Sequence, residues 1–273
     1  MKISEPVRPI GRFHGLSAEG WILNDCSADR SPCWEDPIEA VTMVVRDRLG
    51  DFLHSIYLRG SVARGTAVPE VSDLDMLIVY EDEYDAPDWA WSKALAEEIR
   101  SRFPFCKGLD LNFLNRTILQ ERRAGAPYRF MLRTQSVCLV GRDLVPTMPQ
   151  FKPDPTVMFS LSLLVADLRN AGQTSPGGNK EVCCSLMRRV VRSAGEVAML
   201  YDGRFTRDLG LCVENYLLHA RSLRQMSVIP EALSLALQPI EELNHVLTVA
   251  RLAEKELRAA LESRELSQKV AQG

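Results

Sequence analysis

Ile-Tyr-Leu-Arg-Gly-Ser-Val-Ala-Arg-Gly at residues 56–65 and Val-Ser-Asp-Leu-Asp-Met-Leu-Ile-Val-Tyr at residues 71–80 each contain an apolar run. The first run ends in Gly-Ser, and the second opens with Asp-x-Asp after a short loop that contains Pro69. Both runs are rich in β-branched and aromatic residues and are bounded by turn-forming residues, which is typical of buried strands. The sequence therefore predicts two strands joined by a polar loop.

Two aspartates begin the second predicted strand. Because side chains alternate along a strand, Asp73 and Asp75 project from one face, whereas Leu74 and Met76 face the other way. Two carboxylates this close repel each other and are costly to bury beside an apolar sheet. A divalent cation removes that cost. Magnesium suits the site, because it prefers hard oxygen ligands and keeps positions for water and for substrate phosphates.

The Gly-Ser turn predicts a binding site for phosphate. Gly60 lets a phosphate approach the backbone closely, and backbone N–H groups in a tight turn form an anion-binding concavity. The Ser61 hydroxyl adds a donor, and Arg64 offers a charged fork for phosphate oxygens. A phosphate site beside a pair of metal-binding carboxylates suits the transfer of a phosphorus-centred group from a nucleoside triphosphate.

Together these motifs resemble the signature of the DNA polymerase β-type nucleotidyltransferase superfamily. Residues 60–65 and 72–75 closely resemble its small prokaryotic members and the antibiotic (aminoglycoside-type) nucleotidyltransferases. The superfamily pattern also expects a third carboxylate on a later apolar strand, and Leu-Asp-Leu-Asn-Phe-Leu at residues 109–114 supplies it at Asp110. The resemblance covers residues 37–145 and is only architectural beyond them. It implies an α+β fold, in which a mixed β-sheet with flanking helices is followed by an all-α helical bundle domain.

The resemblance also implies a mechanism. Asp73 and Asp75 hold two Mg²⁺ ions, and Asp110 completes one metal site or acts as general base for the acceptor hydroxyl. Gly60 and Ser61 position the phosphates of the donor, which we expect to be ATP because ATP is frequent in the family. A nucleoside monophosphate is transferred to the acceptor, and pyrophosphate leaves.

The expected acceptor is a small hydroxylated molecule, with aminoglycoside-like antibiotics as the family's example. The net charge of −3 and the acidic stretch at residues 82–88 are compatible with a cationic acceptor. Two alternatives stay open, namely transfer to a macromolecule such as a protein or a tRNA end, and a non-catalytic nucleotide-binding partner. A structural interpretation also stays open, in which Asp-x-Asp merely enters a strand and Gly-Ser forms a plain loop.

Composition predicts a globular cytoplasmic protein. The 273 residues are 46% hydrophobic and 25% charged, the usual mixture for one large or two ordinary domains. The slightly acidic balance disfavours a protein that grips long nucleic acid, because such proteins usually carry a basic surface. No apolar run is long enough to span a membrane, and the start lacks the apolar core of a signal peptide. The seven scattered cysteines indicate reduced thiols, and a zinc site from Cys26, Cys33 and His14 fits no standard spacing.

The chain divides into four predicted segments. Residues 1–35 are irregular and are interpreted as an N-terminal arm. Residues 36–145 form the nucleotidyltransferase catalytic domain. Four prolines stiffen residues 146–155 into a linker. Residues 156–273 carry Leu, Val and Ala at helical spacing, which predicts a C-terminal helical domain.

Helices and one more strand are predicted around the two motif strands. Asp36 and Pro37 form a good helix start, since an aspartate can cap and a proline fits the first helical position. This helix is expected to end near Leu49. Further helices are expected at 87–102 and at 115–133, the latter broken at 125–127, and a strand is expected at 135–141.

Cations of the helical domain are candidates for contact with the triphosphate. In the two-domain nucleotidyltransferases that this chain resembles, the helical domain closes over the cleft and helps to hold the triphosphate. Lys180, at a helix start, is the expected phosphate contact, and Arg204 and Arg207 are its rivals. The alternative for each of them is an ordinary surface cation.

Overall fold

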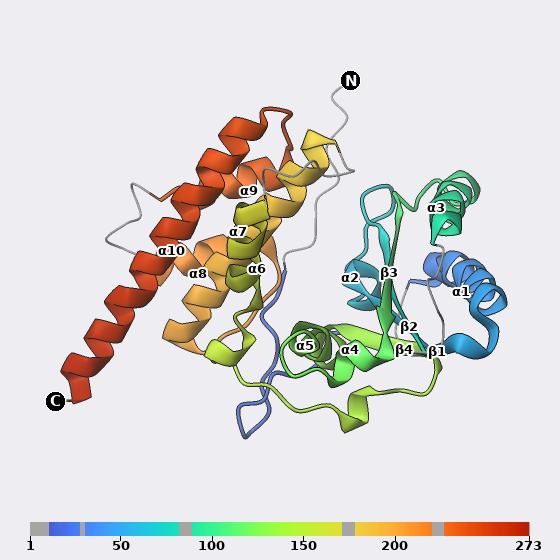
Figure 1. Ribbon diagram of the computed structural model, residues 1–273, viewed down its shortest axis with the longest axis horizontal. Helices are drawn as coiled ribbons and strands as arrows, with labels where there is room; N and C mark the ends of the chain where they lie inside the picture. Colours follow the sequence, from blue (N-terminus) through green and yellow to red (C-terminus); the bar gives the residue numbers. More distant parts are fainter. Residues whose placement is uncertain (1–10, 28–30, 82–88, 171–177, 220–226, 273) are drawn as a thin grey trace. The chain divides into compact units, whose positions relative to one another are not determined.

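The computed structural model describes residues 11–27, 31–81, 89–170, 178–219 and 227–272. The chain divides into two compact units (Figure 1). The described part of the first unit is Leu23–Gln150, and the second unit combines Gly11–Ile22 with the chain from Phe151 onward. The acidic stretch that suggested a cationic acceptor, residues 82–88, lies outside the described residues.

A four-stranded mixed sheet forms the centre of the first unit. Its strands are β1 (Leu53–Arg59), β2 (Leu74–Tyr80), β3 (Leu109–Asn115) and β4 (Ser136–Gly141), in the order β3-β2-β1-β4. β1 pairs antiparallel with β2 and with β4, and β2 pairs parallel with β3. The parallel pair is connected through helix α3 (Ala90–Arg102), since parallel neighbours need a crossover.

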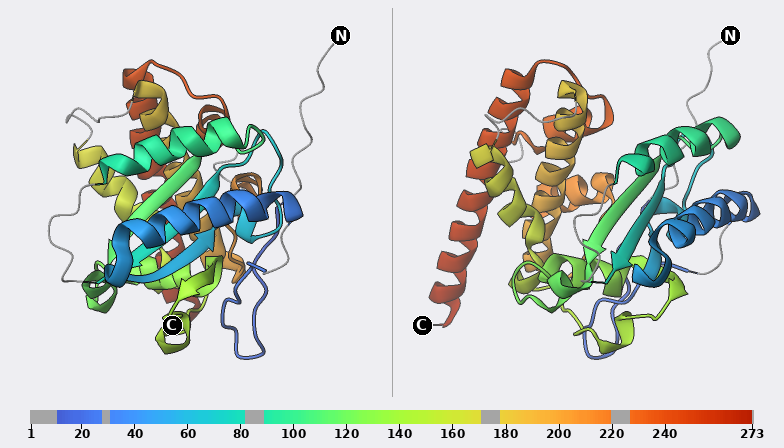
Figure 2. Two further views of the ribbon diagram at one scale, coloured as in Figure 1. Left: turned by 90° about the vertical axis from the view of Figure 1, so that its right-hand side faces the viewer. Right: turned by 45° about the vertical axis from the view of Figure 1, so that its right-hand side comes forward.

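Helices α1 (Glu35–Leu49) and α3 cover one face of this sheet (Figure 2). α1 buries Ile38, Val41, Val45 and Leu49, which recur every three or four residues and so form one apolar stripe. This stripe joins a core with the even-numbered side chains of β1 and β2. α1 begins two residues earlier than predicted, and Asp36 makes no capping hydrogen bond there.

The opposite face of the sheet carries a smaller core and the predicted site. Tyr57 and Leu77 pack there with helices α4 (Arg116–Gln120) and α5 (Ala126–Gln135). These two helices replace the single broken helix that the sequence predicts. Because side chains alternate along a strand, Arg59, Asp75 and Asp110 project from this same face.

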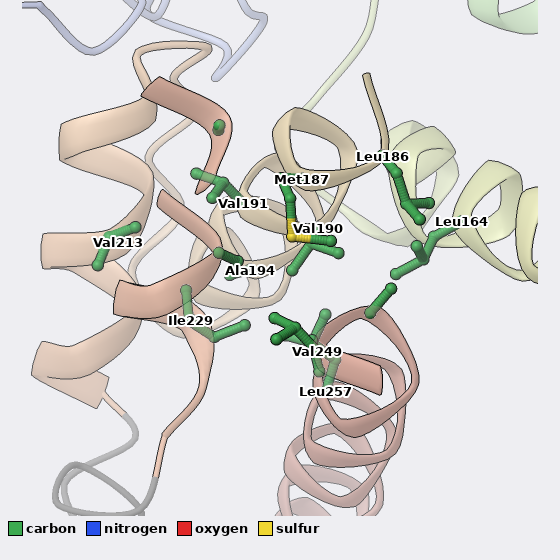
Figure 3. Close-up of a cluster of buried hydrophobic side chains, with 14 of the residues drawn as sticks. Leu164, Leu186, Met187, Val190, Val191, Ala194, Val213, Ile229, Val249 and Leu257 are labelled. Carbon is green, nitrogen blue, oxygen red and sulfur yellow. The ribbon is translucent and has the colours of Figure 1, made fainter. Parts of the chain in front are cut away.

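The second unit is built from helices around an apolar core. The described helices are α6 (Phe159–Asn170), α7 (Asn179–Asp202), α8 (Leu209–His219), α9 (Ile229–Leu237) and α10 (Leu243–Gln272). α7 contacts the other four and supplies more of the buried hydrophobic side chains than any other described helix, including Met187, Val190 and Ala194 (Figure 3). The predicted α+β fold with a helical region at the C-terminal end is therefore confirmed. None of the described helices is both long and apolar enough to cross a membrane.

The N-terminal stretch predicted as one arm over residues 1–35 is shared between the two units. In the second unit, the His14 backbone N–H donates to the Phe205 carbonyl at 2.8 Å, and the Ile22 N–H donates to the Phe151 carbonyl at 2.8 Å. Trp34 is instead buried in the first unit, directly before α1. Irregular sequence carries no periodicity from which this division could be predicted.

Candidate active site

The order of the strands brings the predicted site residues to one end of the sheet. β1 ends where β2 begins because these strands are antiparallel, and β3 begins beside β2 because those strands are parallel. The register pairs Arg59 with Asp75 and Asp75 with Asp110. Directly paired residues on neighbouring strands share a face. Arg59, Asp75 and Asp110 therefore form a row across three strands, which we call the charged row.

Gly60 places the Gly-Ser turn directly against Asp75. Its φ of +76° lies in the left-handed region, which glycine adopts without steric cost. A Cβ atom at Gly60 would lie 1.9 Å from Oδ2 of Asp75. The turn continues as α2 (Gly60–Ala63), which is anchored by the buried side chains of Val62 and Ala63. Glycine is thus required both by the backbone and by the neighbouring carboxylate.

Asp73 lies just before β2, beside a second glycine. A Cβ atom at Gly108 would lie 3.3 Å from Oδ1 of Asp73, so a larger residue would crowd this carboxylate. The Gly108 carbonyl accepts from the Leu74 N–H at 2.8 Å and from the Cys106 thiol at 3.1 Å. Burial raises the pKa of Cys106, so this thiol keeps its proton and remains a donor. These bonds hold the start of β2, and with it Asp73, next to the start of β3.

Arg59 and Asn112 contact the predicted site residues, although the sequence did not predict either of them as part of the site. Nη2 of Arg59 donates to Oδ2 of Asp110 at 3.1 Å and lies 3.7 Å from Oδ1 of Asp75. Nδ2 of Asn112 donates to Oδ1 of Asp110 at 2.9 Å. The signal for Asn112 was its i, i+2 spacing from Asp110. The signal for Arg59 was its place immediately before Gly60, where antiparallel pairing sets it opposite the aspartate strand.

The donor set at this end of the sheet fits the chemistry of magnesium. Asp73, Asp75 and Asp110 offer carboxylate oxygens from neighbouring strands, which are the ligands that magnesium prefers. Within the described residues, no three His, Cys, Asp or Glu side chains are grouped closely enough to hold a metal ion as they stand. The Arg59 guanidinium bridges Asp75 and Asp110 instead.

Ser61 lies on the turn and Arg64 directly follows it, and both residues make contacts there. Ser61 is in the first turn of α2, and its carbonyl accepts from the Thr66 N–H at 2.9 Å. Nε of Arg64 lies 4.0 Å from Oδ2 of Asp25, whose side chain is only 6% exposed. Arg64 thus connects the turn to the segment before α1. Its contact with phosphate stays a prediction.

The three cations predicted on the helical domain differ in how firmly they are bonded. Nζ of Lys180, at the start of α7, lies 4.0 Å from Oε1 of Glu241, and both side chains are more than 60% exposed, so this pair contributes little. Nε of Arg204 donates to Asp202 at 2.7 Å. Arg207 donates to a serine hydroxyl of α6 at 3.4 Å. The part of each cation in nucleotide binding stays a prediction.

A family comparison defines the class of this protein. Residues 43–127 match the family model described as the nucleotidyltransferase domain. The matched segment contains the Gly-Ser turn and Asp73, Asp75 and Asp110. The first unit therefore contains a nucleotidyltransferase domain of the DNA polymerase β type, and the protein is a nucleotidyltransferase.

A solved structure shares the overall fold. Spectinomycin adenyltransferase AAD(9) from Enterococcus faecialis, determined with ATP and spectinomycin, matches with a TM-score of 0.50 and 15% identity. The match covers 82% of this chain and 98% of that chain, so the fold resembles that of an antibiotic nucleotidyltransferase. A protein from Sulfolobus solfataricus matches with a TM-score of 0.25 and 19% identity, over 43% of this chain and 94% of that chain. No curated protein matches the sequence.

The close approach of Gly60 to Asp75 gives a testable result. Gly60→Ala adds left-handed backbone strain of about 1–2 kcal/mol and pushes the Asp75 carboxylate away from its place in the charged row. We expect nucleotidyl transfer by the folded variant to fall at least about 100-fold, since a displacement of roughly 1 Å costs that much. The measurement is the transfer rate per folded molecule, with folding checked by circular dichroism.

Gly20→Ala is the matched control for this substitution. Gly20 has a similar φ of +82°, but a Cβ atom there has no neighbour within 4 Å. The control adds comparable backbone strain without touching a carboxylate, so its transfer rate should stay near that of the unmodified protein. Equal losses in the two variants would mean that strain, not contact with Asp75, explains the effect.

Proposed function

We propose that this protein transfers a nucleoside monophosphate, AMP from ATP, to a hydroxyl group of a small acceptor and releases pyrophosphate. The proposal depends on one observation. Asp75 is paired with Asp110 in the charged row, and the turn at Gly60 packs against Asp75. This arrangement places a turn suited to phosphate next to carboxylates suited to a metal ion. It lies inside a nucleotidyltransferase domain.

Asp73, Asp75 and Asp110 are the residues that would hold magnesium, with two ions in the complete site. When bound, magnesium supplies charge neutralisation to the triphosphate and lowers the pKa of the acceptor hydroxyl. The Ser61 hydroxyl and the backbone of its turn donate to phosphate oxygens and orient the triphosphate. The ATP complex of the structurally similar AAD(9) motivates the choice of donor.

The reaction is an in-line displacement at the α-phosphorus. The acceptor oxygen forms a new bond to this phosphorus, and the bond from phosphorus to the oxygen bridging the α- and β-phosphates breaks. The bridging oxygen leaves as part of pyrophosphate. Asp110 is our candidate for taking the acceptor's proton. It is 54% exposed and lies two strands away from the end of β1, where the Gly-Ser turn begins.

We propose a small cationic acceptor, by analogy with aminoglycoside-like antibiotics. The support is the net charge of −3 and the fold shared with AAD(9), which was solved with spectinomycin. Transfer to a protein or a tRNA end is the second candidate, because the same chemistry serves any accessible hydroxyl. A non-catalytic nucleotide-binding partner is the third. A cytoplasmic site of action follows from the proposed use of ATP.

Label transfer tests these candidates in one experiment. Purified protein is incubated with magnesium, nucleotides labelled at the α-phosphate, and separate pools of small hydroxylated amines, proteins and RNA. We expect label from ATP to appear in a small molecule together with magnesium-dependent release of pyrophosphate. Label in protein or RNA would establish the second candidate, and nucleotide binding without pyrophosphate release would establish the third.

Ser61→Ala tests the role of the turn in binding phosphate. We expect use of the triphosphate to weaken by roughly ten- to a thousandfold, the range from one lost donor to a charged group to one lost transition-state donor. Transfer rates measured over a range of ATP concentrations separate affinity from turnover. Ser234→Ala, which removes an exposed hydroxyl from α9, serves as the control. Unchanged kinetics in Ser61→Ala would mean that this hydroxyl does not contact the phosphates.

A further inference from the structure

The side chain of Arg59 spans the whole charged row. Neighbouring strands lie about 4.8 Å apart, so Arg59 on β1 must reach over the strand of Asp75 to meet Asp110 on β3. Its Nη2 atom lies 3.1 Å from Oδ2 of Asp110 and 3.7 Å from Oδ1 of Asp75. One guanidinium nitrogen thus contacts both carboxylates that the proposed function assigns to the metal.

Packing holds Arg59 in this position. Its side chain is 24% exposed, and Nη1 lies 3.3 Å from Sδ of Met131 on α5. Nε is buried and has no hydrogen-bond acceptor among the described residues. A solvent-exposed arginine would keep that donor hydrated. Contact with the two carboxylates is therefore retained at the expense of one unsatisfied N–H group.

We propose that Arg59 is a positioning residue that acts as an internal counter-cation, holding Asp75 and Asp110 together without metal and competing with the divalent ion for them. Two carboxylates in register repel each other, and a positive charge in contact with both reduces that repulsion. Magnesium binds oxygen at about 2.0–2.1 Å, so it takes the space and the lone pairs that the guanidinium occupies. Arg59 must therefore leave Asp110 when the metal binds. This inference rests on the proposed metal-dependent function.

Manganese binding to the full-length protein tests the competition without measuring transfer. Electron paramagnetic resonance measures the concentration of free Mn²⁺ during titration of the unmodified protein and of Arg59→Gln. We expect Arg59→Gln to bind Mn²⁺ more tightly by roughly two- to fivefold, the range for losing a partly exposed ion pair. Without metal, the variant should unfold at a lower temperature than the unmodified protein. Saturating Mn²⁺ should narrow that difference.

Arg116→Gln is the matched control. Nε of Arg116 lies 3.0 Å from Oε2 of Glu81, so this pair joins the opposite ends of the same two strands, β2 and β3. Its loss should leave Mn²⁺ affinity unchanged. If Arg59→Gln does not fold, Arg59→Lys keeps the charge on a shorter side chain. The lysine variant should bind Mn²⁺ more tightly than the unmodified protein, because the shorter side chain reaches Asp110 less well.

The outcomes separate this inference from the proposed function. Asp75→Asn, titrated in parallel, shows whether Mn²⁺ binds at the charged row. If Asp75→Asn leaves the affinity for Mn²⁺ unchanged, Mn²⁺ does not bind at the charged row. That result would overturn both the proposed metal site and the inference. Binding that depends on Asp75, but is equal or weaker in Arg59→Gln, would overturn the competition alone and leave the proposed metal site standing.

Discussion

Asp75→Ala is expected to lower nucleotidyl transfer by at least about three orders of magnitude, because bound metal supplies several kcal/mol of transition-state stabilisation. Asp75 is the central member of the charged row, with Gly60 on one side and Asp110 on the other. Its loss would remove one of the carboxylates proposed to hold magnesium. We expect the same order of loss for Asp73→Ala, since Asp73 directly precedes the same strand.

The fold should survive this substitution. Removal of Asp75 also removes its repulsion with Asp110, which keeps its hydrogen bonds from Arg59 and Asn112. Circular dichroism and gel filtration check the fold, and labelled ATP with the acceptor that the label-transfer experiment identifies measures the rate. Asp47→Ala, on the exposed side of α1 in the same unit, is the control and should retain full activity. Near-normal turnover in Asp75→Ala would refute the proposed mechanism.

The second large effect is expected for Asp110→Asn, which separates binding from chemistry. Asp110 lies on β3, at the end of the charged row away from the Gly-Ser turn. We therefore expect magnesium–ATP to bind nearly as well as before, while transfer falls about 100-fold or more, the usual contribution of a positioned base. Calorimetry with a non-hydrolysable ATP analogue gives the first quantity, and single-turnover transfer gives the second.

Glu81→Gln is the control for Asp110→Asn, because it also replaces a carboxylate by a neutral amide. Glu81 follows β2 at the end of the sheet opposite the charged row and pairs with Arg116 at 3.0 Å. Neither binding nor transfer should change in this variant. Transfer that is unchanged in Asp110→Asn would remove Asp110 from the chemistry. Loss of folding in Asp110→Asn, with Glu81→Gln intact, would instead identify Asp110 as a structural carboxylate.

Local patterns in the sequence were sufficient to predict the main elements of the first unit. The apolar runs that became β1 and β2 are bounded by turn residues, and the alternation of a strand places Asp75 on a defined face of β2. Helical spacing likewise predicted a helical region at the C-terminal end. These features depend on a few neighbouring residues, so no long-range information was needed.

Helix limits were less predictable, because caps depend on tertiary contacts. Asp36 and Pro37 carried a start signal, yet α1 begins at Glu35, following the buried Trp34. A short 3-10 helix at Pro32–Trp34 leads directly into α1, so the chain is already helical before Asp36. Arg129 shows the same limit. Its side chain donates to the carbonyl groups of Glu121 and Arg122, which directly follow α4, and no local pattern predicts these bonds.

Only the tertiary structure decides how the charged groups of the site meet. Asp75 and Asp110 are far apart in sequence, and Arg59 belongs to a third strand, so their contact depends on strand order and register. Strand order and register depend on which apolar side chains of the sheet pack against α1 and α3. This packing is a property of the whole core. For the same reason, no local pattern reveals that Gly60 must lack a side chain to admit Asp75, or that a guanidinium bridges the two carboxylates.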